Sequence, residues 1–73
     1  MLSHMETDVA VEVVSSIRGN IFRHTEQHKK TPEIEADIKT ILAFKRKALR
    51  NFKDMDFDEI LEFSSFWFAK YPN

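Results

Sequence analysis

The chain has 73 residues, enough for one small domain, and its lack of cysteine excludes disulfides and thiolate metal sites. Eleven basic and twelve acidic residues give a net charge of −1, so the chain as a whole has no electrostatic attraction to nucleic acid or to a membrane surface. A core this small rarely supplies more than about 3–5 kcal/mol. We therefore expect either tight helix packing or self-association.

The N-terminal residues are expected to have no role. The stretch MLSHMETD lacks the basic and then apolar run of a signal peptide, and no apolar run approaches transmembrane length. Ser3-His4-Met5 resembles a vector-derived scar, so we expect residues 1–6 to be a disordered N-terminus or a tag remnant. Residues 7–73 are then a single helical domain, and the expected location is cytoplasmic.

The first helix is predicted over residues 8–29, with Thr7 or Asp8 as its N-cap. The short run Val9, Val11 and Val13 also alternates as a strand would, but this alternation stops at Val14. The helical spacing persists longer, so helix is the interpretation we favour. The apolar positions recur in steps of three and four residues: Ala10, Val13, Val14, Ile17 and Ile21.

A strand followed by two helices would be the order of ribbon-helix-helix DNA-binding dimers. In such proteins the outward side chains of the strand read the major groove. Here those side chains would be Asp8, Ala10 and Glu12, and carboxylates facing phosphates have the wrong sign. The sequence therefore argues against this alternative.

The second helix is predicted over residues 32–52. Thr31 as N-cap and Pro32 at the first helical position are a strong start signal, and the short connection predicts an antiparallel hairpin with the first helix. Lys45 falls inside the apolar face, where its long stem can lie along apolar surface. That predicted core face contains Ile34, Ile38, Ile41, Leu42, Ala48, Leu49 and Phe52.

The third helix is predicted over residues 57–70. Asp56 and Glu59 have the spacing of a capping box, and Met55 with Ile60 fits a hydrophobic staple. The predicted core face contains Phe57, Ile60, Leu61, Ser64, Phe68 and Tyr71, and Phe63 and Trp67 widen it on one side. The expected fold is all-α, an antiparallel helical hairpin with a shorter third helix across it. We also expect a homodimer, because the shorter helix leaves part of the hairpin uncovered.

Three phenylalanines, Phe22, Phe44 and Phe66, lie off the main apolar stripe of their helices. They can be core residues, because each helix of a three-helix bundle contacts two neighbours and buries a broad stripe. Alternatively they form a contact surface, since clustered exposed aromatic residues mark interfaces. We expect another protein or a second copy to contact the aromatic third helix and the basic stripe: Phe44, Lys45, Arg46, Arg50, Phe63, Phe66, Trp67 and Tyr71.

Basic residues are concentrated between Lys45 and Lys53. They occupy the C-terminal half of the second helix, where the helix dipole favours cations, and acidic residues follow. A solvated, internally paired face therefore explains them. The alternative is a nucleic-acid-binding module whose contacts would be Lys39, Arg46, Arg50 and Lys53.

His24 and His28 share one helical face, four residues apart, as metal ligands often do. However, HTEQH is not the HExxH zinc motif, and no third ligand is evident. A single glycine excludes a glycine-rich phosphate loop, and no triad can be inferred around Ser64 and Ser65. We expect no metal, no cofactor and no catalysis. The predicted function is that of a small regulatory or adaptor protein that binds other proteins.

Overall fold

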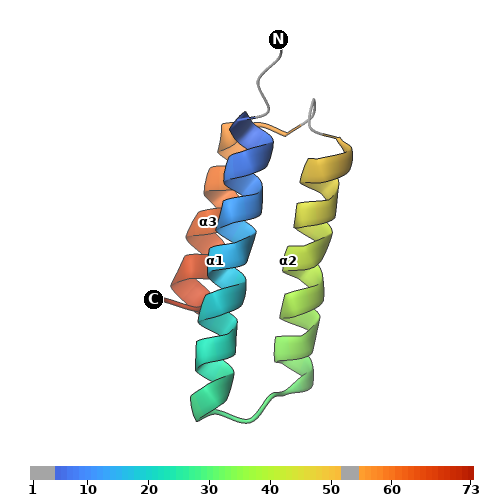
Figure 1. Cartoon of the computed structure of the whole chain (residues 1–73). Coiled ribbons are helices and arrows are strands. Elements are labelled where there is room, and N and C mark those ends of the chain that lie inside the picture. Colours follow the sequence, from blue (N-terminus) through green and yellow to red (C-terminus); the bar gives the residue numbers. More distant parts are fainter. Residues whose placement is uncertain (1–4, 52–54) are drawn as a thin grey trace.

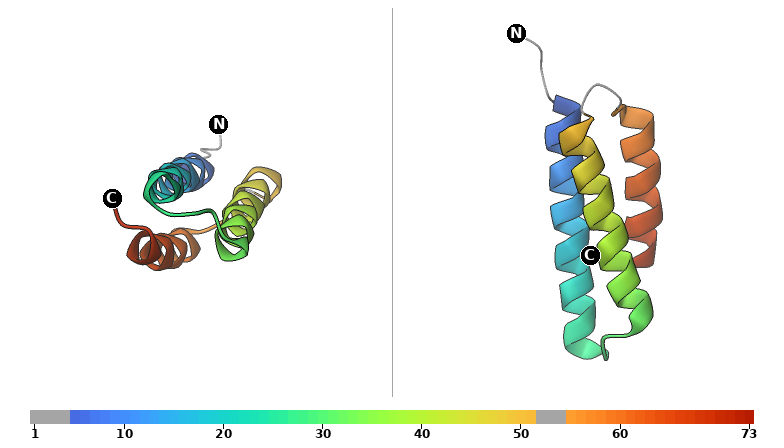
Figure 2. Two further views of the ribbon diagram at one scale, coloured as in Figure 1. Left: turned by 90° about the horizontal axis from the view of Figure 1, so that it is seen from below. Right: turned by 90° about the vertical axis from the view of Figure 1, so that its right-hand side faces the viewer.

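Three helices pack side by side in the computed structural model, which describes residues 5–51 and 55–73. They are α1 (Met5–Gln27), α2 (Pro32–Arg50) and α3 (Phe57–Lys70). Figure 1 shows α1 and α3 running in one direction and α2 in the opposite direction, and the left view in Figure 2, from the end of the bundle, shows the three helices around one shared interior. The predicted all-α fold with an antiparallel α1–α2 hairpin is confirmed.

The helix ends follow from their capping residues. The Thr31 hydroxyl accepts a hydrogen bond from the Ile34 N–H at 3.2 Å, and the Asp56 carboxylate accepts one from the Glu59 N–H at 2.8 Å. Only half of the predicted capping box forms, because the Glu59 carboxylate pairs with Lys47 of α2. The caps fix the starts of α2 and α3 at the predicted residues.

The other predicted ends differ by a few residues. The first helix begins earlier than predicted, at Met5, and ends earlier, at Gln27. It ends there because the chain must turn before Thr31, which is extended (φ −111°, ψ 164°) as the residue before a proline has to be. The second helix ends at Arg50, and Phe52, predicted as its last residue, lies outside the described part.

The buried face of α1 is the predicted one. Its side chains between Ala10 and Ile21 reach relative exposures of 0–1 %, and Val13 beside them is half-buried. This stripe contacts both of the other helices, because its residues belong to two neighbouring core clusters. The fully buried members are Ala10, Val14, Ile17 and Ile21.

The predicted core faces of α2 and α3 are wrong at three positions. Leu49 is 55 % exposed, Phe57 is 50 % exposed and Leu61 is 65 % exposed. Both helices are rotated relative to the prediction, and their inward positions follow steps of three and four residues. These are Ile34, Asp37, Ile41, Phe44 and Ala48 in α2, and Ile60, Phe63, Trp67 and Tyr71 in α3, with Phe44 and Phe63 half-buried.

We expect Ile41→Ala to lower the free energy of unfolding by about 2–5 kcal/mol, because Ile41 is fully buried and its truncation leaves a cavity in the core. Urea denaturation followed by circular dichroism measures this change. Phe66→Ala is the control, since Phe66 is 60 % exposed, and it should change stability by only about 0.5 kcal/mol. Equal effects of the two substitutions would contradict the assigned core.

Candidate functional site

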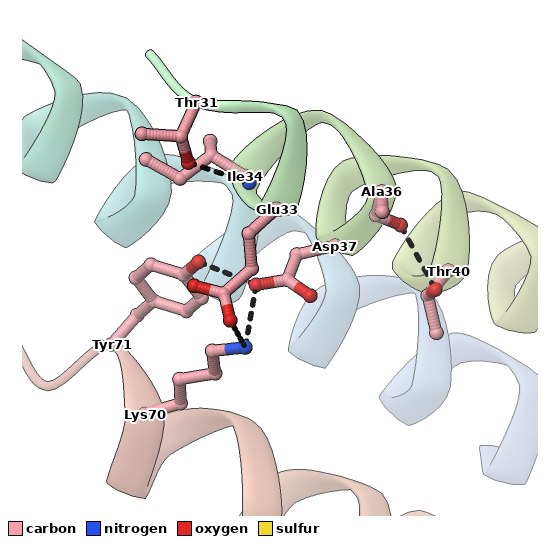
Figure 3. Close-up of polar contacts among 8 residues, drawn as sticks. All are labelled: Thr31, Glu33, Ile34, Ala36, Asp37, Thr40, Lys70 and Tyr71. Carbon is pink, nitrogen blue, oxygen red and sulfur yellow. Dashed lines mark hydrogen bonds and ion pairs between the residues drawn. The ribbon is translucent and has the colours of Figure 1, made fainter. Parts of the chain in front are cut away.

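A buried carboxylate joins α2 to the end of α3. Asp37 is 8 % exposed, and its Oδ2 accepts a hydrogen bond of 2.5 Å from the Tyr71 hydroxyl. Figure 3 shows the Lys70 ammonium reaching the same carboxylate at 2.9 Å and Glu33 at 3.7 Å. Asp37 therefore has two partners from α3 and its C-cap, which offset the cost of burying its charge.

The same contacts change the acid–base behaviour of both partners. The hydrogen bond from Lys70 to Asp37, helped by the charges of Asp37 and Glu33, raises the pKa of Lys70. Burial raises the pKa of Tyr71, and its hydrogen bond to Asp37 and the negative charge of that carboxylate raise it further. Both groups thus keep their protons in the folded protein at pH values where the unfolded chain begins to lose them.

Aromatic rings form a ladder from α2 across α3 to α1. The rings of Phe44 and Phe63 stack with centroids 3.8 Å apart, and Phe63 contacts Trp67 at 6.0 Å. Trp67 lies parallel to Tyr71 at 6.2 Å, and Tyr71 meets His24 edge-on at 5.5 Å. These rings fill the interior between α2 and α3.

The predicted partner-binding aromatic residues therefore occupy different environments. Trp67 and Tyr71 are only 6 % and 4 % exposed, so they belong to the core and offer a partner almost no surface. Phe44 and Phe63 are half-buried and stack on each other. Phe66 alone of this set is well exposed, with its ring edge-on to Trp67 at 5.0 Å.

The predicted basic residues lie on another side of the molecule. At about 100° per residue, Arg46 points almost opposite to Phe44, which faces α3, and Arg50 points about 120° away from it. Both arginines are exposed and Lys45 is half-buried, and none of the three forms an ion pair with another described residue. Phe66 therefore does not share one surface with the basic stripe, by which we mean Lys45, Arg46 and Arg50.

The nucleic-acid alternative rests on part of the same stripe. Lys39, like Arg46 and Arg50, is exposed and shares their side of α2. Lys53, the fourth residue of that prediction, lies outside the described residues. The structure thus brings three of the four predicted phosphate contacts onto one helical face.

Two strips of exposed or half-buried apolar side chains flank α1, and the sequence pattern assigned them to the core. We call Leu42 and Leu49 the α2 strip and Phe57 and Leu61 the α3 strip. Asp37 and Phe44 mark the side of α2 that faces α3, so the α2 strip lies on the other side of the buried stripe, next to α1.

The same reasoning places the α3 strip. Phe63 and Lys70 face α2, because Phe63 stacks on Phe44 and Lys70 pairs with Asp37. Phe57 and Leu61 lie on the opposite side of α3 and also border α1. Both strips could have been found from the series of three- and four-residue steps through Phe44 in α2 and through Trp67 in α3, because the strip residues lie outside these series.

The two strips have borders of opposite charge. The α3 strip is bordered by the exposed carboxylates Asp58 and Glu62, whereas the α2 strip is bordered by Lys39, Arg46 and Arg50. Between the strips, the outward face of α1 carries two more exposed carboxylates, Asp8 and Glu12. Near the start of α1 the surface is thus apolar on both flanks, basic beside the second half of α2 and acidic beside α3.

The two histidines lie at the hairpin end of the bundle. The rings of His24 and His28 stack with centroids 4.4 Å apart, and both side chains are exposed. Open depressions of about 360 and 320 Å³ lie beside His24, one of them lined by Arg23 and Tyr71 and the other by Lys29 and Lys70. Among the described residues, no group of three or more histidine or carboxylate side chains is placed to hold a metal ion.

Comparisons with known proteins give no identity. The chain matches no protein-family model, no curated protein and no solved structure. None of the three helices is long and apolar enough to cross a membrane, as far as the described residues extend. The geometry of the surface is therefore the basis for any functional assignment.

We expect the free energy of unfolding to fall as the pH rises above about 10, the ordinary pKa of tyrosine. Both Tyr71 and Lys70 have raised pKa values, so the folded state holds these protons more tightly than the unfolded chain does. Their stabilising contribution is present below the ordinary pKa values and is lost as the pH passes through the raised ones.

Tyr71→Phe tests the tyrosine part of this dependence. It should make the loss of stability above about pH 10 shallower, and at pH 7 it should cost about 1.5–3 kcal/mol, because Asp37 loses a hydrogen bond to its charge. Urea denaturation at a series of pH values gives both quantities. An unchanged slope in Tyr71→Phe would contradict the role of this hydroxyl.

Proposed function

We propose that the protein is non-catalytic and acts through protein–protein contact, with the α3 strip as the surface that binds a partner. The observation that carries the proposal is the exposure of Leu61 (65 %) and Phe57 (50 %), one helical turn apart on the same side of α3. Apolar side chains cost free energy when they face water, and neighbouring exposed ones mark contact surfaces. This surface differs from the one that the sequence predicted around Phe66 and Trp67.

The chemistry of the strip suggests the kind of partner. Residues spaced one turn apart on a helix offer the ridge against which an amphipathic helix packs its own apolar face. The border of Asp58 and Glu62, with Glu12 on α1, would attract basic side chains and repel acidic ones. We therefore infer an amphipathic helical segment of another protein, with lysine or arginine beside its apolar face.

Nucleic-acid binding has less support and stays a prediction. Lys39, Arg46 and Arg50 are exposed and carry no ion pair with another described residue, which suits phosphate contacts. However, Asp8 and Glu12 lie on the adjacent helix and would repel a phosphate backbone laid across that side of the molecule. Steeply salt-dependent retention of DNA or RNA, lost in Arg46→Ala/Arg50→Ala, would support this alternative.

The proposal predicts that Phe57→Ser and Leu61→Ser each abolish the capture of a protein partner from the cells that make the protein. Both side chains are at least half exposed, so the thermal unfolding midpoint should change little. Affinity capture followed by mass spectrometry compares the variants with the unaltered chain. The expected result is a captured species that disappears in both variants.

Phe66→Ser is the matched control. Phe66 is on the same helix and is 60 % exposed, but it lies on a different side of α3 from Leu61. It should retain the partner. Loss of the partner in Phe66→Ser, with retention in Leu61→Ser, would instead favour the surface predicted from the sequence.

A further inference from the structure

The α1–α2 side of the molecule has matching edges of opposite charge. Arg46 and Arg50 lie along the outer edge of α2, and Asp8 and Glu12 lie along the outer face of α1. All four side chains are exposed. Heights along the bundle can be compared because the Thr7 hydroxyl of α1 donates to the Ala48 carbonyl of α2 at 3.3 Å. Asp8 and Glu12 follow Thr7 by one and five residues, and Arg46 and Arg50 lie two residues to either side of Ala48.

These charges do not neutralise one another within the molecule. The ion pairs of the described residues join α2 to α3, through Lys47–Glu59 and through Lys70 with Glu33 and Asp37, and none joins α1 to α2. The α2 strip lies between the two charged edges, and so does Phe22, which is further along α1 and 46 % exposed. The guanidinium carbon of Arg18 lies over the Phe22 ring, 5.3 Å from its centroid. This side therefore has an apolar centre, one basic edge and one acidic edge.

We propose that a second copy of this chain docks on the α1–α2 side, related to the first by a two-fold axis parallel to the helices. Such an axis preserves height along the bundle and exchanges left for right. It therefore places α1 of each copy against α2 of the other, with Asp8 and Glu12 facing the partner's Arg46 and Arg50. The α2 strips of the two copies meet in the centre, where Leu42 and Leu49 lose contact with water.

The resulting arrangement is a four-helix bundle made of two hairpins. Because α1 and α2 are antiparallel within each copy and alternate around the bundle, every pair of adjacent helices is antiparallel. A two-fold axis perpendicular to the helices would instead place α2 against α2 and α1 against α1. With such an axis at the height of Arg46 and Arg50, like charges would face each other at both contacts, and the charge pattern selects against that arrangement.

The α3 strip does not suit a second copy in the same way. Its borders, Asp58 and Glu62 on α3 and Glu12 on α1, are all acidic, so self-association there would bring carboxylates together. The dimer proposed here leaves α3 on the outside of the four-helix bundle. Phe57 and Leu61 remain accessible with Asp58 and Glu62 beside them, Glu12 being the border residue that the dimer also uses, and the self-association does not depend on the proposed function.

Charge reversal tests the proposal. Asp8→Lys/Glu12→Lys makes both edges basic, and Arg46→Glu/Arg50→Glu makes both edges acidic, so each variant alone should raise the dimer dissociation constant about 100-fold or more. An equimolar mixture of the two variants should form a heterodimer, because both of its contacts are complementary again. A chain with all four substitutions should dimerise with itself for the same reason.

Sedimentation equilibrium over a wide range of protein concentrations gives the molar mass, against 8.6 kDa for one chain. The unaltered chain, the mixture and the four-substitution chain should approach twice this mass, and the two charge-reversed variants should not. Circular dichroism checks that each variant is helical. Leu49→Lys, at a position 55 % exposed, is a second variant that should stay folded and lose the dimer.

Other outcomes overturn the proposal. A monomer at every concentration excludes the second copy, and dimers that persist in both charge-reversed variants or that fail to return in the mixture exclude this arrangement. A dimer lost in Leu61→Ser but kept in Arg46→Glu/Arg50→Glu would place self-association on the α3 strip. That last result would also remove the α3 strip from the proposed function, whereas the other failures would leave it untouched.

Discussion

The burial of Asp37 is the constraint on which the rest of the structure depends. A buried carboxylate without partners costs several kcal/mol, so α2 can turn Asp37 inward only where the Tyr71 hydroxyl and the Lys70 ammonium reach it. This contact sets the rotation of α2 and the position of the end of α3. With α2 so rotated, Phe44 meets Phe63 and Leu49 faces water. The surface of the protein thus follows from one polar contact in its interior.

Much of the fold could be predicted from the sequence, because its signals are local. The stripe from Ala10 to Ile21, the cap at Thr31 and the cap at Asp56 each depend on residues within a few positions of one another. The rotation of α2 could not be predicted in this way. Its two possible inward faces each contain one charged residue, Asp37 or Lys45, and the choice depends on Tyr71, which lies 34 positions further along the chain.

The candidate site was harder to predict for the same reason. A concentration of aromatic residues in α3 indicates an interface and a core equally well, and Trp67 and Tyr71 turn out to serve the core. Once their rings fill the interior between α2 and α3, Phe57 and Leu61, which the sequence pattern assigned to the inside, are left exposed together with Phe66. The division of the surface into acidic and basic sides then depends on three helix rotations at once.

The third helix is shorter than the hairpin that it covers, and this has a consequence for local stability. Figure 1 shows the α1–α2 turn extending beyond the end of α3, so that part of the bundle has two helices in contact instead of three. The energy needed to open a segment depends on how much buried surface it loses. Fraying should therefore start at the turn around Lys29 and Lys30, and backbone amides there should exchange with solvent sooner than those beside Ile41. The two ends of the bundle would then differ in the time over which they stay closed, although α1 and α2 run through both.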